Sequence, residues 1–372
     1  MRTVGIITMH RVLNCGSALQ AYALQHKIEQ LGFKSELIDY KYPNSYHKSI
    51  RRSNKSNFIV RLINDIYTFL NSLYLKSTFS HFYKCYFVLS SRYYKTRNEI
   101  KEHPPVYDVY VSGSDQVWNP RYIGKDTTFM LSFTSSDNKV SYASSLASHG
   151  FEKDIEDLFA KHLGKFKDVS VREEMSCEYV KRLCGKDCKF VLDPSMLLTP
   201  TEWAPILKHS KCKLSDKPYI LIYVLGYSFN VYDYAADLIN HVQKQTGWKV
   251  KVLIFSRYHR KLLNKYTAVN GVSPETFLQL IKNAALVITD SFHATAFSLN
   301  FSKPVFPLIK SRENIDNRVF SLLKSLGADD WAIERDQPFK ELPPILKDYS
   351  SVEKNIVKLR KESIDYLLKA LK

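Results

Sequence analysis

Two stretches far apart in the chain end apolar runs in small and polar residues, the residue types that bind anions and transfer protons. Residues 111–118 read Val-Ser-Gly-Ser-Asp-Gln-Val-Trp, and residues 287–297 read Val-Ile-Thr-Asp-Ser-Phe-His-Ala-Thr-Ala-Phe. Each has the pattern of a buried strand followed by a turn or a helix. In open α/β sheets such strand ends expose backbone N–H groups and bind ligands. The two strand ends therefore predict one ligand-binding cleft.

His293 is the residue of the second stretch best suited to acid–base chemistry. It follows an apolar strand at the expected start of a helix, beside Asp290 and Ser291. A helix N-terminus disfavours the imidazolium form, whereas a bound phosphate dianion favours it. His293 therefore suits a general acid or a phosphate-binding group, and the alternative is a structural histidine at a helix cap.

Three cations are placed to hold an anion beside these strand ends. Arg172 ends a short strand expected over residues 168–174, and Lys310 and Arg318 flank the strand and helix that follow the second stretch. A guanidinium or ammonium group at a strand end can clamp a phosphate or carboxylate. Each is equally compatible with an ordinary surface cation.

Two loops of the first half supply the remaining candidates. The first precedes a helix expected over residues 18–31, where free N–H groups suit either an anion or an ordinary N-cap. The second follows a strand expected over residues 107–112; there Gly113 permits a sharp turn and Trp118 supplies a flat apolar wall. Asp115 is a candidate base that is also able to cap its loop. The candidate binding residues of these loops are Asn14, Gly16, Ser17, Gly113, Ser114, Gln116 and Trp118.

The composition is that of a basic globular protein. The chain has 372 residues, with 54 Lys plus Arg against 37 Asp plus Glu and a formal net charge of +17. Such an excess favours anionic partners. Helix-turn-helix, finger and RNP patterns are missing, which argues against nucleic acid. Phosphate-loop, Gly-x-Gly-x-x-Gly, His-Glu-x-x-His and Gly-x-Ser-x-Gly patterns are missing too, which argues against kinases, dinucleotide enzymes, zinc hydrolases and serine hydrolases.

Cysteine usage and the N-terminus indicate a cytoplasmic protein. Cys184-x-x-x-Cys188 lacks a second pair of Cys or His at metal-site spacing, so we expect reduced thiols and no metal. The N-terminus begins a strand rather than a signal peptide, and no apolar run is long enough to span a bilayer. The basic run at residues 47–61 is either solvated surface or a peripheral contact with an anionic inner membrane face.

Strands and helices alternate in both halves, which predicts an α/β fold of two doubly wound, Rossmann-like domains facing a cleft. Apolar runs ending in small or polar residues predict strands over residues 139–147 and 190–195, among others. The expected parts are an N-terminal domain over residues 1–200 with a helical, aromatic and basic insert at about 43–105, a C-terminal domain over 201–345, and a helix over 346–372 that packs back on the N-terminal domain.

Taken together and in order, these motifs resemble the polysaccharide pyruvyl transferase family. The match runs from about residue 4 to residue 327. It is carried by Asn14-Cys-Gly-Ser-Ala-Leu-Gln-Ala-Tyr22, Ser112-Gly-Ser-Asp-Gln-Val-Trp-Asn119, Ser141-Tyr-Ala-Ser144, Val171-Arg-Glu-Glu174, Leu192-Asp-Pro194, Thr289-Asp-Ser-Phe-His293 and the region around Arg318.

The resemblance implies a GT-B-like enzyme that takes phosphoenolpyruvate as co-substrate, with no cofactor. Such an enzyme sets a pyruvate ketal on a sugar of a cell-surface polysaccharide, or of its lipid-diphosphate- or nucleotide-linked precursor, and releases phosphate. It further implies that Arg172 binds the donor and that His293 matches the histidine of an Arg-Leu-His motif. Here that motif reads Ser291-Phe-His293, so the second clamp comes from Lys310 or Arg318, or the donor differs.

The sequence leaves two points open: which residue accepts the proton, and which activity the chain has. Asp115 or Asp290 can receive a proton from the sugar hydroxyl. A GT-B glycosyltransferase with a nucleotide-sugar donor fits the same architecture, and so does a non-catalytic relative, because function resides in the site rather than in the fold. The sequence also leaves the acceptor sugar and the oligomeric state open.

Overall fold

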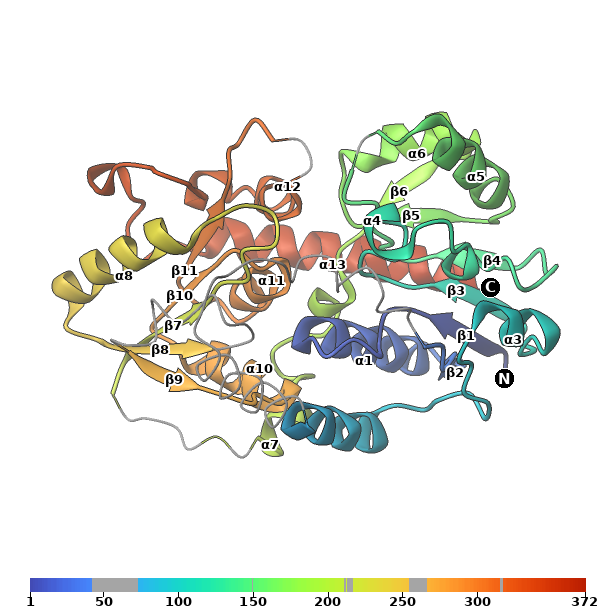
Figure 1. Ribbon diagram of the computed structural model, residues 1–372, viewed down its shortest axis with the longest axis horizontal. Coiled ribbons are helices and arrows are strands. Elements are labelled where there is room, and N and C mark those ends of the chain that lie inside the picture. Colours follow the sequence, from blue (N-terminus) through green and yellow to red (C-terminus); the bar gives the residue numbers. More distant parts are fainter. Residues whose placement is uncertain (42–72, 149, 211, 213–216, 254–265, 315–316) are drawn as a thin grey trace, which may run out of the picture. The chain divides into compact units, whose positions relative to one another are not determined.

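The computed structural model describes residues 1–41, 73–148, 150–210, 212, 217–253, 266–314 and 317–372 (Figure 1). These residues divide into two compact units. Unit 1 comprises Met1–Leu197 together with Arg360–Lys372, and unit 2 comprises Leu198–Leu359. Each is an α/β unit with a parallel sheet, and each is described by itself below.

Unit 1 is built on a four-stranded parallel sheet in the order β2-β1-β3-β4. A parallel pair, β5 and β6, continues beside it through backbone bridges at Val140–Asp168 and Ser144–Val171. Because all these strands are parallel, their carboxyl ends lie at one edge. The strands are β1 (Thr3–Ile7), β2 (Lys34–Leu37), β3 (Val109–Ser112), β4 (Lys139–Ser141), β5 (Val169–Val171) and β6 (Cys188–Phe190).

The helices of unit 1 connect these parallel strands and bury the faces of the sheet. β3 is buried at all four residues, as expected for a strand covered on both faces. Figure 1 shows α5 and α6 side by side next to β5 and β6. The helices are α1 (Cys15–Gln30), an unlabelled helix over 73–86, α3 (Arg97–Glu102), α4 (Pro120–Ile123), α5 (Lys153–Leu163) and α6 (Ser176–Cys184), with short 3-10 turns at η2 (Thr128–Met130) and η3 (Pro194–Met196).

Unit 2 carries a six-stranded parallel sheet in the order β12-β11-β10-β7-β8-β9. Its three middle strands are fully buried, with apolar runs such as Tyr-Ile-Leu-Ile-Tyr in β7. The strands are β7 (Tyr219–Tyr223), β8 (Lys249–Leu253), β9 (Thr267–Val269), β10 (Leu286–Thr289), β11 (Val305–Ile309) and β12 (Ile333–Glu334). The helices are α7 (Ala204–Lys208), α8 (Tyr232–Thr246), α10 (Pro274–Asn283), α11 (Phe292–Asn300) and α12 (Arg318–Ser325), with 3-10 turns η5 (Asp329–Trp331) and η6 (Phe339–Glu341).

The long helix α13 (Ser350–Leu371) begins in unit 2 and ends in unit 1. Its second half is bonded to strands and loops of unit 1. Arg360 donates to the carbonyl of Met196 at 2.7 Å, and Tyr366 Oη donates to the carbonyl of Ser141 at 3.0 Å. Ser363 Oγ accepts from the amide of Leu192 at 2.9 Å. Unit 1 is therefore assembled from two separate segments of the chain.

Two predicted strands are wrong in their extent. The strand expected over residues 139–147 ends at Ser141, because Ala143 takes a left-handed backbone with φ 53°. The strand expected over residues 190–195 lies earlier, at β6, and Asp193 instead caps η3 by accepting from the amide of Ser195. Of the predicted insert at 43–105, residues 42–72, including the basic run, lie outside the described residues.

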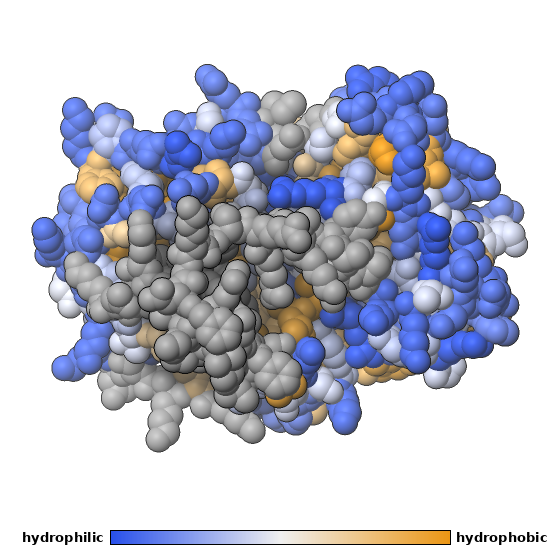
Figure 2. All heavy atoms as spheres, in the orientation of Figure 1, coloured by the Kyte–Doolittle hydropathy of each residue, from blue (hydrophilic) through white to orange (hydrophobic). Residues whose placement is uncertain are grey.

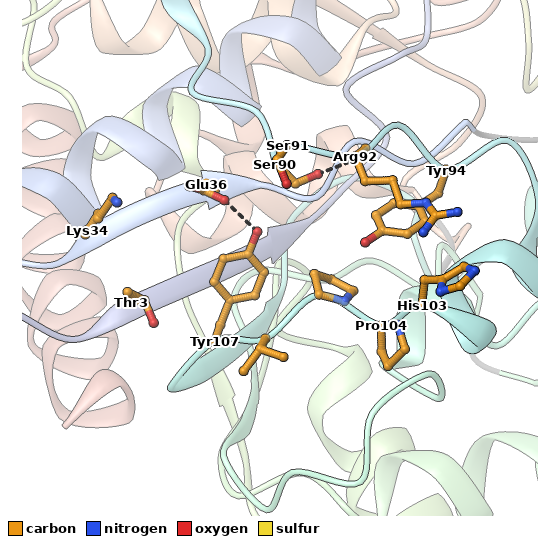
Figure 3. A pocket seen from close by; sticks show the side chains of 12 residues that line it. Thr3, Lys34, Glu36, Ser90, Ser91, Arg92, Tyr94, His103, Pro104 and Tyr107 are labelled. Carbon is orange, nitrogen blue, oxygen red and sulfur yellow. Dashed lines mark hydrogen bonds between the residues drawn. The ribbon is translucent and has the colours of Figure 1, made fainter.

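Gly5 of β1 lies under the aromatic ring of Tyr107, whose hydroxyl donates to Glu36 Oε2 at 2.8 Å (Figure 3). A Cβ at Gly5 would lie within 2.8 Å of Tyr107 Cγ and closer still to the ring edge. Gly5→Ala is therefore expected to destabilise unit 1 by about 2 kcal/mol, the usual cost of overpacking. Urea unfolding tests this against Gly150→Ala, where a Cβ meets nothing within 4 Å. Equal stability of the two variants would contradict the prediction.

Candidate functional site

In unit 1 the loops after β1 and β3 meet at the carboxyl edge through Ser17 and Asp115. Ser17 Oγ donates to Asp115 Oδ2 at 2.5 Å, while Asn14 accepts from the amide of Ser17 and caps α1. Asp115 holds a left-handed backbone with φ 75°, which costs energy in a residue with a side chain. Its side chain is 10 % exposed and also accepts from the amide of Gln116. The structure thus brings the two predicted loops together at the carboxylate of Asp115, a residue whose backbone is strained.

Arg172 lies at the centre of a buried charge cluster formed with Asp115, Glu173 and Asp193. Its Nε donates to Glu173 Oε1 at 3.2 Å and its Nη1 donates to Asp193 Oδ2 at 3.0 Å. Its Nη2 lies 3.9 Å from Asp115 Oδ1, and the side chain is 1 % exposed. Burial lowers the pKa of Arg172, but the three carboxylates outweigh that effect and raise it. Such burial argues against the predicted direct contact of Arg172 with phosphoenolpyruvate.

Serine hydroxyls complete the bonding of this cluster. Ser114 Oγ donates to Asp193 Oδ2 and Ser145 Oγ donates to Glu173 Oε1, both at 2.8 Å. Asp193 also accepts from the amide of Ser195 at 2.9 Å. Ser114 was predicted to bind ligand, but it is fully buried in this network. The cluster therefore fixes the loops after β3, β4, β5 and β6 to one another.

Two further predictions for the loop after β3 need correction. Trp118 is fully buried in the core, edge-to-face against Phe166 at 5.8 Å, and cannot be a wall for a ligand. The residue of the turn with a positive φ is Asp115, not Gly113. A Cβ at Gly113 would instead be a close contact, because it would lie 3.2 Å from both the Leu24 and Thr8 side chains and would require them to shift. Gln116, half-buried, accepts from the side-chain amide of Asn119 at 2.7 Å.

In unit 2, Asp290 ties the end of β10 to the end of β7. Its two carboxylate oxygens accept from the amides of Leu225 at 2.6 Å and Gly226 at 2.7 Å. Thr289 Oγ1 donates to the carbonyl of Tyr223 at 2.5 Å, which adds a second link between the same strand ends. Asp290 thus holds the ends of β7 and β10 together. Its role as a base stays a prediction.

Ser291 and His293 occupy the N-terminus of α11. Ser291 is the N-cap, and its hydroxyl accepts from the amide of Ala294 at 3.4 Å. His293, in the first turn, is 7 % exposed and lies edge-to-face on Phe292. Lys310 follows β11, the strand beside β10, and is exposed. Arg318 is the first residue of α12, after the N-cap Asn317. The strand order therefore brings these predicted residues to one edge of unit 2.

A further charged group at the carboxyl edge of unit 1 was not predicted. Asp39, which follows β2, accepts from Arg11 Nε at 2.6 Å, and Arg11 Nη2 bonds its other oxygen. His10 Nε2 lies 3.4 Å from the same carboxylate, and Arg11 packs over the rings of Tyr83 and Tyr93. Burial raises the pKa of Asp39, but the bonds from His10 and Arg11 outweigh it and hold the pKa below its usual value.

Asp39→Asn is expected to cost unit 1 about 1.5–3 kcal/mol near pH 7, the range for hydrogen bonds to charged groups. Because the folded pKa of Asp39 is lowered, its contribution is present above the unfolded value of about 3.9 and is lost as pH falls through the folded pKa. Urea unfolding between pH 7 and 3 measures the difference in the free energy of unfolding between wild type and variant. This difference should become smaller as the pH falls.

The control for Asp39 is Asp154→Asn, which removes a surface pair with Lys125 and should leave the free energy of unfolding nearly unchanged, because solvent screens exposed pairs. A gap for Asp39→Asn that stays constant to pH 3 would show that its cost is not electrostatic.

Sequence reasoning did not select Glu173, Asp193 and Asp39 as site residues, although the structure places them in the charge clusters of this edge. Each follows the end of a parallel strand, which is the signal that selected Asp115 and Asp290. Their positions after strand ends could have selected them from the sequence. The residues that they contact are known only from the structure, in which the strands are paired.

Within the described residues, no helix is long and apolar enough to cross a membrane, and no group of three or more His, Cys, Asp or Glu side chains is arranged to hold a metal ion. Figure 2 shows hydrophilic residues over much of the described surface in that view. That the two carboxyl edges line one cleft stays a prediction.

Comparison with known proteins gives one family and one type of fold. The family model described as polysaccharide pyruvyl transferase matches residues 14–310. No curated protein matches the chain significantly. Among solved structures, UDP-GlcNAc 2-epimerase from Methanocaldococcus jannaschii is 12% identical, with a TM-score of 0.52, 96% of this chain covered and 92% of that chain.

Two other solved structures have similar scores. The UDP complex of MnaA from S. aureus has a TM-score of 0.52 at 11% identity, with 98% of this chain and 88% of that chain covered. UGT89C1 from Arabidopsis thaliana has a TM-score of 0.50 at 10% identity, with 100% of this chain and 99% of that chain covered. At these identities the likeness concerns the fold alone. It confirms the predicted α/β, GT-B-like class.

Proposed function

Because the chain belongs to the polysaccharide pyruvyl transferase family, we propose that it transfers pyruvate from phosphoenolpyruvate to two hydroxyls of one sugar. The product is a cyclic ketal carrying a carboxylate, and inorganic phosphate leaves. The acceptor is a sugar of a capsule or exopolysaccharide, or of its lipid-diphosphate- or nucleotide-linked precursor. Phosphoenolpyruvate is a co-substrate, and the proposed reaction uses no cofactor.

The observation that carries this proposal is the extent of the family match. It spans residues 14–310, from the N-cap of α1 in unit 1 to Lys310 at the end of β11 in unit 2. The matched region therefore includes the candidate residues of both edges except Arg318. A partial match confined to one Rossmann-like unit would support only the fold.

The chemistry needs one proton donor, one proton acceptor and a site for anions. C3 of the enol takes a proton, which leaves cationic character at C2. One sugar hydroxyl then attacks C2 and loses its proton. The C2–O bond to phosphate breaks, and the second hydroxyl attacks C2 to close the ring and passes its proton to the departing phosphate. The proton transfers among these steps are acid–base chemistry. A positioned side chain that transfers a proton raises the reaction rate by about 10²–10⁴-fold.

In unit 2, His293 suits the proton donor or the group that holds the departing phosphate. It lies in the first turn of α11, where free amides and the helix dipole also favour an anion. Ser291, which replaces the family arginine, is already the N-cap of this helix. The missing positive charge is therefore assigned to Lys310, which is exposed, or to Arg318.

In unit 1, Asp115 suits the proton acceptor, and Arg172 suits a positioning role. Asp115 is held in a strained backbone and accepts from Ser17, so its carboxylate is fixed in one orientation. Arg172 contacts three carboxylates from different loops and keeps Asp115 in place. We assign Asp290 to the support of its own strand ends rather than to proton transfer.

Calorimetric titration with phosphoenolpyruvate tests the donor. Wild type should bind it, and Lys310→Gln and Arg318→Gln should each weaken binding if they replace the family arginine. Lys324→Gln, a basic residue in the last turn of α12, is the control and should have no effect. Binding of a nucleotide sugar without phosphoenolpyruvate would favour the glycosyltransferase alternative. Absence of binding by either would favour a non-catalytic relative. The cytoplasmic location and the membrane contact stay predictions.

A further inference from the structure

A second feature of the carboxyl edge of unit 1 is a pocket of about 740 Å³ between the end of β2, α3 and α4. A volume of this size suits a small-molecule ligand. Its walls come from the segment after β2, the start of α3, the loop from α4 onward, and α5. The lining residues used below are Tyr40, Lys41, Lys95, Arg97, Ile123 and Lys125.

Four cations line this pocket, and among the described residues three of them make no ion pair with a carboxylate. Lys41, Lys95 and Arg97 are exposed and make no ion pair among the described residues. Lys125 pairs with Asp154 at the rim, at 2.6 Å. Unpaired like charges repel one another, so a pocket that gathers three of them favours an anion.

The carboxylates near the pocket are already bonded. Asp126 accepts from Tyr40 Oη at 2.7 Å, from Thr128 Oγ1 at 2.6 Å and from the Thr128 amide at 3.0 Å. Glu99 accepts from the amide of Lys95 at 2.7 Å, in a capping box with Thr96. Asp126 lines the pocket and keeps its negative charge, so the lining carries four cations against one carboxylate and remains positive.

The same bonds hold the pocket in shape before any ligand arrives. The capping box fixes the backbone of Lys95 and Arg97. The amide of Lys41 donates to the carbonyl of Tyr94 at 2.8 Å, which fixes Lys41 beside Lys95. Part of the lining is apolar, since it includes Ile123 and Tyr40, which are 2 % and 3 % exposed. Preorganised cations beside an apolar lining suit a polyanionic group joined to a less polar part.

We infer that this pocket binds the diphosphate group of the acceptor substrate. The inference rests on the proposed function, which requires a glycan acceptor, and it adds the chemical group by which that acceptor is held. A diphosphate carries several negative charges on a compact group, which three or four cations can contact at once. Lipid-linked and nucleotide-linked sugars share it, so both sources are consistent with the same pocket.

The test titrates inorganic pyrophosphate, UDP and farnesyl diphosphate into wild type and two charge-matched double variants. Lys95→Gln/Arg97→Gln alters the pocket. The control variant is Lys34→Gln/Arg92→Gln, which also removes one lysine and one arginine charge. These two residues line a different pocket, shown in Figure 3, where Thr3 and Lys34 begin β1 and β2. All four side chains are exposed, so both variants should fold. Solutions contain 150 mM salt, which screens non-specific attraction.

We expect the pocket variant to weaken pyrophosphate binding on the order of tenfold or more, and the control variant to weaken it less than about twofold. Tighter binding of UDP than of pyrophosphate would identify a nucleotide-linked acceptor, and tighter binding of farnesyl diphosphate a lipid-linked one. Equal losses in both variants, or no pyrophosphate binding to wild type, would overturn the inference.

Phosphoenolpyruvate titration separates this inference from the proposed function. The pocket variant should bind phosphoenolpyruvate with an affinity within twofold of wild type. If phosphoenolpyruvate fails to bind while the pocket still governs pyrophosphate affinity, the proposed function is wrong and the diphosphate site stands. If a loss of phosphoenolpyruvate affinity accompanies the loss of pyrophosphate affinity in the pocket variant, the pocket is a donor site and the inference is wrong.

Discussion

Arg172→Met is expected to destabilise unit 1 by about 3–5 kcal/mol, the cost of removing one partner from a buried ion pair. The guanidinium is 1 % exposed and bonds Glu173 and Asp193. Without it, these carboxylates and Asp115 would face one another with no positive charge between them. Methionine fills most of the volume, so the loss reports charge rather than a cavity. Urea unfolding near pH 7 measures it.

The pH dependence identifies the cause of the Arg172→Met loss. Protonation of the carboxylates relieves their repulsion, so the gap between wild type and variant should narrow as pH falls towards 4. Lys181→Met, which removes a surface pair with Asp187, is the control and should lower the free energy of unfolding far less than Arg172→Met does, because solvent screens the exposed pair. A gap that is independent of pH would contradict the electrostatic account of this cluster.

His293→Gln is expected to lower kcat with phosphoenolpyruvate by about 10²–10⁴-fold, the range for loss of a general acid. Glutamine is close to the imidazole in size, and it keeps a polar side chain but cannot transfer a proton near neutral pH. The variant should fold like wild type, because Ser291 rather than His293 caps α11. Phosphate release measures the rate, and thermal unfolding checks the fold.

A titration of the His293 ring by NMR distinguishes catalysis from structure. The helix N-terminus opposes the imidazolium form and a bound phosphate favours it, so phosphoenolpyruvate should raise the pKa of His293. His241→Gln, beside Phe339 in unit 2, serves as the control and should leave kcat unchanged. An unchanged kcat in His293→Gln would exclude the proposed proton transfer.

Much of the fold could be predicted because long apolar runs end in clear signals. β10 forms where the stretch at residues 287–297 predicted a buried strand, since four buried residues are followed at once by Asp290 and Ser291. The strand at 139–147 was predicted too long for the opposite reason. Ala143 adopts a left-handed backbone, and alanine carries no sign of that conformation. Local propensity cannot reveal a strain that tertiary contacts impose.

The candidate site was found by position but not by environment. Asp115, Arg172 and Asp193 all follow strand ends, so their place at the carboxyl edge was predictable. Their mutual contact depends on the pairing of β5 with β6 and on the bridge between Asp115 and Ser144. Trp118 shows the same limit, because a large aromatic residue near a predicted site is also what a core requires. The exposed fraction of the side chain distinguishes a ligand-binding aromatic residue from a core residue. That fraction is known only from the structure.

The two-segment construction of unit 1 has a consequence for the order of folding. Residues 360–372 supply the bonds from Arg360, Ser363 and Tyr366 to the loops and strands of residues 141–196. On the ribosome, these residues emerge only after the whole of unit 2 has been synthesised. Unit 2, built from one continuous segment, can complete its core first, although domains usually fold in order from the N-terminus. The unit that is translated first is therefore the last to be finished, and the edge that residues 360–372 cover stays open while residues 198–359 are synthesised.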